Sequence, residues 1–191
     1  MSRKLILAAV LALATPAFAQ ETDGPGPNLV IDIAGQANGT VVIDLLPDIA
    51  PRHVAQITAL AKEGAYDNVV FHRVIDGFMA QTGDVQFGKT GGDLSMAGRG
   101  GSSKPDIPAE FTNTISFQRG VVGMARAQDP NSANSQFFIT FGDASFLDGQ
   151  YTIVGKVISG MEVVDAIKRG EGQNGEVSAP ADVMVKVTVQ E

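Results

Sequence analysis

A tight hairpin is predicted by the sequence FHRVIDGFMAQTGD, residues 71–84. The Asp-Gly dipeptide at its centre turns the chain, because glycine adopts positive φ without steric cost. Side chains alternate along a strand, so Met79 and Gln81 share one face of the second arm. Arg73 adds a guanidinium to a segment that otherwise favours burial. The hairpin therefore brings an apolar wall, a cation and an amide close together, which indicates a small binding site.

Other short strands surround this hairpin. Residues rich in β-branched side chains predict strands at 29–33 and 40–45, and the Asn-Gly dipeptide between them is a strong hairpin signal. Further strands are predicted at 115–125, 136–141, 153–158 and 183–189. Many short strands separated by turn residues predict an all-β barrel or sandwich.

Two helices are also predicted. The first covers residues 47–64, where Pro51 suits the first turn and Gly64 suits the end. Its apolar residues recur at helical spacing, so one face is expected to pack on the sheet or on a barrel end. His53 falls in the first turn and is predicted to be a solvated surface residue. A second, shorter helix is predicted at 161–168.

Composition narrows the class of protein. The chain has 191 residues, which favours one domain, and 44% hydrophobic residues, which is enough for a core. It has no cysteine, which excludes disulfides, a thiolate nucleophile and a cysteine-based zinc site. The formal net charge of -7 argues against binding to nucleic acid or to anionic membranes.

The first residues predict a secretory leader. Arg3 and Lys4 precede an apolar run at 5–14 that is too short to span a bilayer. The pattern Ala-Phe-Ala at 17–19 matches a cleavage site, so we expect residues 1–19 to be a signal peptide cut after Ala19. Residues 20–28 are then a flexible Gly/Pro spacer, and 29–191 form the folded domain, with no membrane association once the leader is removed.

One motif points to a different function. Residues 83–90 match G-x-x-x-x-G-K-[ST], the loop that binds nucleotide phosphates. That loop requires a helix beginning at its lysine, so that the helix N-terminus faces the phosphates. Glycines at 91 and 92 follow instead, and no helix can begin there. The segment 83–108 is therefore predicted to be a long structured loop, the kind that carries function, rather than a nucleotide site.

The histidines do not indicate hydrolase or metal chemistry. There are two, His53 and His72, and no G-x-S-x-G serine motif. His72 faces away from Arg73 in a strand and is predicted to be packed or hydrogen-bonded. A metal site would need clustered ligands at fixed spacing, which the chain lacks, so no metal and no cofactor are expected.

The hairpin and three later blocks resemble the cyclophilin family of peptidyl-prolyl cis-trans isomerases. The later blocks are GMAR at 123–126, NSQFFIT at 134–140 and FLDGQYTIVGKV at 146–157. All four occur in the family's order, and the resemblance extends from about residue 29 to the C-terminus. It implies a closed eight-stranded antiparallel β-barrel, closed by its terminal strands and capped by helices at its ends.

The resemblance also implies a site. On residue type alone, Arg73 would be a solvated or salt-bridged arginine, and the apolar residues would be core. The family pattern instead implies that Arg73 is catalytic. It implies that substrate is bound by ten further residues: Phe78, Met79, Gln81, Ala125, Arg126, Gln136, Phe138, Phe146, Leu147 and Tyr151.

Three positions depart from many eukaryotic members. Phe146 stands in place of Trp, Tyr151 in place of His, and Arg126 in place of Asn. This pattern is similar to the bacterial branch of the family, and together with the leader it suggests an exported, periplasmic member. Without the indole N–H as a donor, we expect weak binding of cyclosporin.

The implied activity is cis-trans isomerisation of X-Pro bonds in exported proteins, assisting their folding. The implied partners are proline-containing peptides and unfolded or folding proteins, and we expect a monomer. The same groove could instead serve a chaperone or peptide-binding module, but the arginine, both glutamines and the aromatic residues favour catalysis. A carbohydrate-binding domain is not favoured, because the chain has no Trp and only two Tyr.

Overall fold

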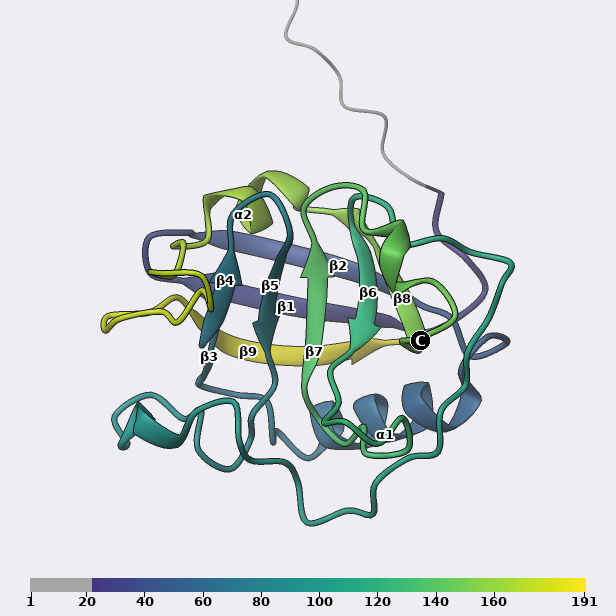
Figure 1. Cartoon of the computed structure of the whole chain (residues 1–191), viewed down its shortest axis with the longest axis horizontal. Helices are drawn as coiled ribbons and strands as arrows, with labels where there is room; N and C mark the ends of the chain where they lie inside the picture. The colour runs from purple at the N-terminus through teal and green to yellow at the C-terminus, as the bar shows by residue number, and fades with distance from the viewer. Residues whose placement is uncertain (1–21) are drawn as a thin grey trace, which may run out of the picture.

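One curled antiparallel sheet forms the body of the protein (Figure 1). The computed structural model describes residues 22–191, so the predicted leader and its cleavage site after Ala19 lie outside the described residues. The strands are β1 (Asn28–Ala34), β2 (Gly39–Leu45), β3 (Val69–Val70), β4 (Arg73–Ile75), β5 (Met79–Thr82), β6 (Val121–Met124), β7 (Phe137–Thr140), β8 (Ile153–Ser159) and β9 (Val183–Gln190).

Two α-helices cover opposite ends of the sheet, α1 (Pro51–Lys62) below it and α2 (Met161–Ala166) above it in Figure 1. Single 3₁₀ turns occur at Leu94–Met96 and Ser145–Leu147. Both helices predicted from the sequence are therefore confirmed, although α1 begins later than predicted. No helix among residues 22–191 is long and apolar enough to span a bilayer.

Both predicted hairpins are confirmed. β1 pairs with β2, with Ile33 opposite Gly39. β4 pairs with β5, with Arg73 opposite Gln81, and Gly77 adopts φ 71° in the turn between them. The register places a guanidinium and an amide side by side on one face of the hairpin.

The sheet differs from the predicted closed barrel of eight strands. It has nine strands in the order β3-β9-β1-β2-β8-β6-β7-β5-β4, and it forms a half-barrel because the edge strands β3 and β4 do not pair. The terminal strands do pair, as expected, through β1 and β9. The chain at 170–177 lies along the β4 edge: Val74 N–H donates to Gly175 O (2.7 Å), and Val177 N–H donates to His72 O (3.0 Å).

The strand predicted at 115–125 is shorter, because only Val121–Met124 is extended in the sheet. Gly120 turns the chain with φ 82°, and Phe117 N–H donates to the Asp148 carboxylate (2.8 Å) instead of to a neighbouring strand. The carboxylate that replaces the strand partner lies 31 residues away in the sequence.

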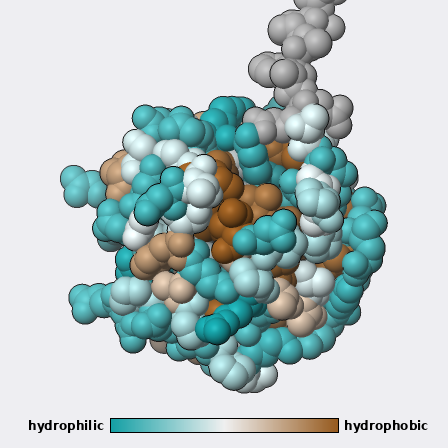
Figure 2. Space-filling view, turned by 90° about the vertical axis from the view of Figure 1, so that its right-hand side faces the viewer, coloured by the Kyte–Doolittle hydropathy of each residue, from teal (hydrophilic) through white to brown (hydrophobic). Residues whose placement is uncertain are grey.

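Two apolar clusters lie on opposite faces of the β4–β5 hairpin. Val74 and Ala80 belong to the main core inside the half-barrel. Met79 belongs to a second cluster with Phe117, Phe138 and other residues. Arg73 and Gln81 share the face of Met79 because of strand alternation. The view in Figure 2 shows hydrophobic side chains reaching the surface in a hollow with a hydrophilic rim.

His53 is not a solvated residue, and that prediction is wrong. Its side chain is fully buried, and its Nδ1 lies 2.7 Å from Glu110 Oε2. The segment that carries Glu110 folds over the start of α1, 57 residues away in the sequence. Within the predicted spacer at 20–28, Gly24 N–H donates to Asp44 (3.1 Å).

Candidate functional site

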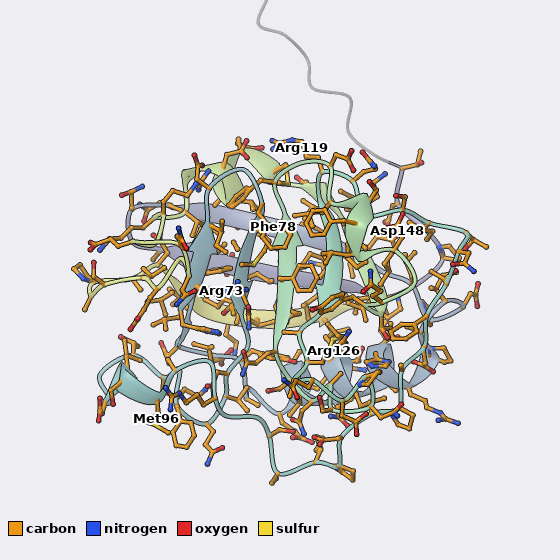
Figure 3. All side chains as sticks on the ribbon, viewed as in Figure 1. Arg73, Phe78, Met96, Arg119, Arg126 and Asp148 are labelled. Atoms are coloured by element: carbon orange, nitrogen blue, oxygen red, sulfur yellow. The ribbon has the colours of Figure 1, made fainter. Side chains whose placement is uncertain are left out.

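Arg73 is fixed at the edge of the β4–β5 hairpin (Figure 3). Its Nε donates to Asn174 O (3.0 Å), and its Nη1 donates to Gln81 Oε1 (3.1 Å). Among residues 22–191 it forms no ion pair, and its Nη2 has no hydrogen-bond partner. Burial lowers the pKa of Arg73, while the nearby phenol of Tyr151 opposes that shift. An arginine side chain nevertheless remains protonated at neutral pH, so the site carries a fixed positive charge.

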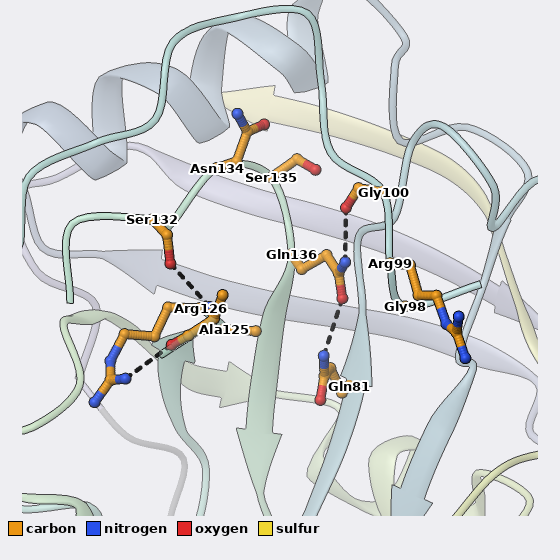
Figure 4. Close-up of a pocket in the computed structure, with 11 residues that line it drawn as sticks. Gln81, Gly98, Arg99, Gly100, Ala125, Arg126, Ser132, Asn134, Ser135 and Gln136 are labelled. Carbon is orange, nitrogen blue, oxygen red and sulfur yellow. Dashed lines mark hydrogen bonds between the residues drawn. The ribbon is translucent and has the colours of Figure 1, made fainter. Parts of the chain in front are cut away.

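A chain of amides holds Gln81 in one orientation (Figure 4). Gln81 Nε2 donates to Gln136 Oε1 (2.9 Å), and Gln136 Nε2 donates to Gly100 O (2.7 Å). Gly100 N–H in turn donates to the buried carboxylate of Asp84 (2.9 Å). The oxygen of Gln81 is therefore directed at Arg73, because its amide nitrogen is already committed to Gln136.

An apolar cavity of about 160 Å³ opens beside the guanidinium. The Phe138 ring forms its floor, stacked on Phe117 (5.7 Å between centroids) and edge-on to Tyr151 (5.9 Å). A side chain at Gly123 would meet Phe138 at 2.6 Å, so glycine is required on β6 beneath this ring. The cavity is lined by Arg73, Phe78, Met79, Gln81, Ala125, Arg126, Phe138, Leu147 and Tyr151.

The structure thus brings together all but two of the residues implied by the family pattern. Gln136 lines an adjoining cavity and reaches the site through its bond to Gln81. Phe146 lies at the rim, 64% exposed, with its ring centroid 5.4 Å from that of Phe78. Phe146 therefore extends the apolar wall outward and does not line the cavity itself.

Arg126 is a second fixed guanidinium at this cavity. It lies over the Tyr151 ring, 4.4 Å from the centroid, and its Nε and Nη2 donate to Gln150 O (3.2 and 3.0 Å). The contact with an aromatic face and the paired hydrogen bonds restrict the side chain to one position.

Sequence reasoning missed three contributors to the site. Asn174 holds Arg73 through its carbonyl, Gly100 anchors Gln136, and Arg99 lines two neighbouring cavities. Gly100 and Arg99 lie in the long loop at 83–108 that was predicted to carry function. The sequence could not indicate the role of Asn174, because a residue of any type supplies a backbone carbonyl.

The motif at 83–90 is not arranged to bind phosphate. Lys89 Nζ donates to Ala65 O (2.6 Å) and Asp67 O (2.5 Å), so its ammonium is turned toward the chain that follows α1. No helix begins at the lysine, as the sequence predicted. Among residues 22–191 there is also no group of three or more His, Cys, Asp or Glu placed to hold a metal ion.

Comparison with known proteins identifies the family. Residues 30–189 match the sequence profile described as cyclophilin type peptidyl-prolyl cis-trans isomerase/CLD.

This chain belongs to the cyclophilin family.

Named relatives support the same assignment, and the chain is a peptidyl-prolyl cis-trans isomerase. A probable peptidyl-prolyl cis-trans isomerase of Brucella suis biovar 1 (strain 1330) is 54% identical over 189 residues, covering 97% of this chain and 94% of that protein. Peptidyl-prolyl cis-trans isomerase CYP57 of Arabidopsis thaliana is 36% identical over 156 residues, covering 81% of this chain and 29% of that protein.

Solved cyclophilins share the fold. A cyclophilin type isomerase of Cryptosporidium parvum, crystallised in the presence of the dipeptide Ala-Pro, superimposes with a TM-score of 0.72 at 26% identity, covering 86% of this chain and 99% of that chain. Cyclophilin AquaCyp293 of Hirschia baltica superimposes with a TM-score of 0.68 at 25% identity, covering 88% and 75%.

The cyclophilin site described above can bind a small apolar ring and place a charged donor beside it. Aromatic and aliphatic side chains line the cavity together with two arginines and Gln81, and no carboxylate, thiol or imidazole of residues 22–191 lines it as a nucleophile or proton carrier. Such a site suits a reaction in which no covalent bond to a heavy atom is made or broken.

Proposed function

We propose that this cyclophilin isomerises X-Pro bonds of proteins exported to the periplasm, and that Arg73 stabilises the twisted amide during rotation. One observation carries the mechanism. Arg73 is fixed by Asn174 O and Gln81 Oε1, and its Nη2 is left without a hydrogen-bond partner at the wall of an apolar cavity.

The physics of the reaction explains why such a site is sufficient. Rotation about an X-Pro bond disrupts amide resonance against a barrier of roughly 18–20 kcal/mol. Without help it takes tens to hundreds of seconds. A catalyst must therefore favour the twisted amide over both planar forms, and it needs neither a nucleophile nor a cofactor.

Arg73 supplies that preference in this proposal. In the twisted amide the proline nitrogen regains a lone pair, which accepts a hydrogen bond from the guanidinium. The apolar walls formed by Phe78, Met79, Phe138 and Leu147 hold the ring, and they strengthen the polar contact by excluding water. Gln81 and the main chain near Ala125 position the rest of the peptide. In planar cis or trans prolyl peptide the nitrogen has no free lone pair, so the contact is specific to the transition state.

The mechanism predicts a large effect of Arg73→Ala. We expect kcat/KM for a proline tetrapeptide, measured in a protease-coupled assay, to fall by more than about tenfold, which corresponds to about 1.4 kcal/mol of transition-state stabilisation. Far-UV circular dichroism should show an unchanged fold. Unchanged turnover would reject the assignment, and so would an equally large loss from His72→Ala in a folded protein.

The proposed periplasmic location is supported by the leader pattern at residues 1–19. It is tested by expressing the full chain in a Gram-negative host and separating the periplasm from the cytoplasm. We expect the protein in the periplasmic fraction, with the mass of a chain whose first residue is Gln20. An uncleaved chain retained in the cytoplasm would contradict export without affecting the isomerase mechanism.

A further inference from the structure

Gln81 lines three cavities, and each pair of these cavities shares one arginine in its lining. The first is the apolar cavity of about 160 Å³. The second, of about 260 Å³, extends past Gln136, and the third, of about 270 Å³, lies on the other side of Arg73. Arg126 lines the first and second, Arg73 the first and third, and Arg99 the second and third.

None of these three arginines forms an ion pair within the described part of the chain. Two arginines that line none of these cavities do form ion pairs. Arg119 pairs with Asp165 (2.6 Å), and Arg169 pairs with Asp76 (2.8 Å). Glu176 lines the third cavity beside Arg73 and Arg99, whereas no acidic residue of the described chain lines the first or second cavity. In a protein with a formal net charge of -7, the first and second cavities are therefore a local region of positive charge.

No carboxylate from the described part of the chain lines the second cavity. It is lined by backbone and small or uncharged side chains between the two arginines: Gln81, Gly98, Gly100, Ala125, Ala127, Ser132, Asn134, Ser135 and Gln136. Two carboxylates contact its wall and are already bonded to it. Asp84 accepts hydrogen bonds from Gly98 N–H (2.7 Å) and Gly100 N–H (2.9 Å), and Asp106 accepts one from Asn134 Nδ2 (2.9 Å).

The two arginines that line this cavity differ in how firmly their side chains are held. Arg126 is fixed by Tyr151 and by the Gln150 carbonyl, so it contributes a stationary positive charge. Arg99 is exposed, and no hydrogen bond or ion pair holds its guanidinium within residues 22–191. Figure 4 places the two side chains on opposite sides of the cavity. Arg99 can therefore turn toward a bound anion, while Arg126 attracts it from the other side.

We propose that the second cavity selects an acidic side chain, Glu or Asp, close to the X-Pro bond in the substrate. This inference rests on the proposed function, because it assumes that the proline ring occupies the first cavity. The carboxylate would accept charge-assisted hydrogen bonds from Arg99 and lie in the field of Arg126. This selectivity arises from Arg99 and Arg126 together, and it acts on substrate binding.

The test uses proline peptides that differ at one residue, which is Glu, Gln or Lys. The variable residue is placed at successive positions on both sides of the X-Pro bond. At one position we expect kcat/KM to be about fivefold higher for Glu than for Gln, the size of a favourable exposed ion pair, and lower still for Lys. The difference should lie in KM with kcat unchanged, because the contact is the same in ground and transition states. It should also shrink at high salt.

Variants assign the effect to the cavity. Arg99→Gln and Arg126→Gln should each move the Glu-to-Gln ratio toward one, whereas Arg119→Gln, which lies on another part of the molecule (Figure 3), should keep it. Equal kcat/KM for Glu and Gln at every position would overturn the inference, and so would a ratio that survives Arg99→Gln.

Calorimetric titration separates the inference from the proposed function. A Kd that is lower for the Glu peptide than for the Gln peptide, and a difference lost in Arg99→Gln, would support the inference even if no peptide were isomerised. Absence of turnover with measurable binding would instead overturn the proposed function. Identical Kd values for Glu and Gln peptides would overturn the inference alone.

Discussion

His72 lies next to Arg73 in the chain and lines the third cavity, but it has no role in the proposed reaction. Its ring is buried, and neither ring nitrogen has a hydrogen-bond partner in the described protein. Burial lowers the pKa of His72 to about 4; Arg73 adds to this shift and Asp84 opposes it. Gln136 and Val70 are also near enough to oppose it, although neither meets the geometry of a hydrogen bond to the ring.

This buried imidazole predicts a loss of stability in mild acid. The folded state keeps His72 neutral, while the unfolded chain binds a proton below its ordinary pKa of 6.5. Stability is therefore fully present above pH 6.5 and falls as the pH drops toward 4. At pH 4.5 we expect a loss of about 2–3 kcal/mol from this residue in the free energy of unfolding.

Urea unfolding at pH 7.5 and pH 4.5 measures this effect, with His72→Gln as the comparison. The pKa of His53 is also lowered, by burial against the opposing effect of Glu110, so wild type and variant share that contribution. The variant should lose less stability than wild type between the two pH values. Parallel losses in the two proteins would contradict the account.

At the scale of residues, the family pattern predicted which side chains meet but not how they are held. Arg73, Phe78, Phe138 and Tyr151 lie together as implied. The partner of Arg73, however, is a backbone carbonyl 101 residues away, and a carbonyl leaves no signature in the sequence. Burial of His53 was not predicted either, because it depends on contact with Glu110, which lies 57 residues away in the sequence.

Among the elements, α1 shows this dependence most clearly. Its N-cap residue is Ala50, whose side chain cannot accept a hydrogen bond from the first turn. Glu110 takes that role from another part of the chain, accepting from Arg52 N–H and His53 N–H (each 3.2 Å). Burial alone would raise the pKa of Glu110, but the hydrogen bonds from the His53 ring and these backbone groups outweigh it and lower the pKa.

Glu110→Ala should therefore act as the loss of a helix cap. We expect the free energy of unfolding to fall by about 1–2 kcal/mol, because two N–H groups and the His53 ring lose their acceptor.

Glu63→Ala is the matched control. Glu63 is the C-cap residue of the same helix, and its side chain forms only an ion pair with Lys104 that is more than half exposed on the glutamate side. It should change stability by less than about 0.5 kcal/mol. Equal effects of the two variants in urea unfolding would show that Glu110 is not the cap.

The type of each element was predictable where the signal is local. The turns at Asn38-Gly39 and Asp76-Gly77 each join a predicted strand pair that the structure contains. Residues 115–120 belong to a strand predicted at 115–125, but Phe117 N–H donates to Asp148 instead of to a neighbouring strand. Competition between a side-chain acceptor and a strand partner is decided by the tertiary fold, which periodicity does not encode.

In the whole molecule, one edge of the sheet is covered by a segment without regular structure. The chain at 170–177 lies along the edge strand β4, and Gly170 N–H donates to Val74 O (2.9 Å) while Gly175 O accepts from Val74 N–H (2.7 Å). The same segment presents Asn174 O to Arg73. The sequence did not predict this arrangement, because a glycine-rich polar segment indicates a loop, although here its backbone bonds to an edge strand. The cover of the β4 edge and the placement of Arg73 are therefore coupled.

Gly175→Ala tests that coupling. Gly175 adopts φ 67°, and an added Cβ would lie 2.5 Å from Ile75 Cγ1 and 2.8 Å from Val74 O. Gly172 adopts nearly the same φ, 65°, but a Cβ there would meet nothing within 4 Å. Both alanine variants carry the cost of a left-handed conformation, about 1–2 kcal/mol, and Gly175→Ala adds a steric cost of about 1–3 kcal/mol.

We expect Gly175→Ala to unfold at clearly lower urea concentration than Gly172→Ala. It should also lower kcat/KM for a proline tetrapeptide, because Asn174 O moves with its neighbour and releases Arg73. If the two variants were equally stable, or if Gly175→Ala were destabilised with full activity, the cover of the β4 edge and catalysis would be independent.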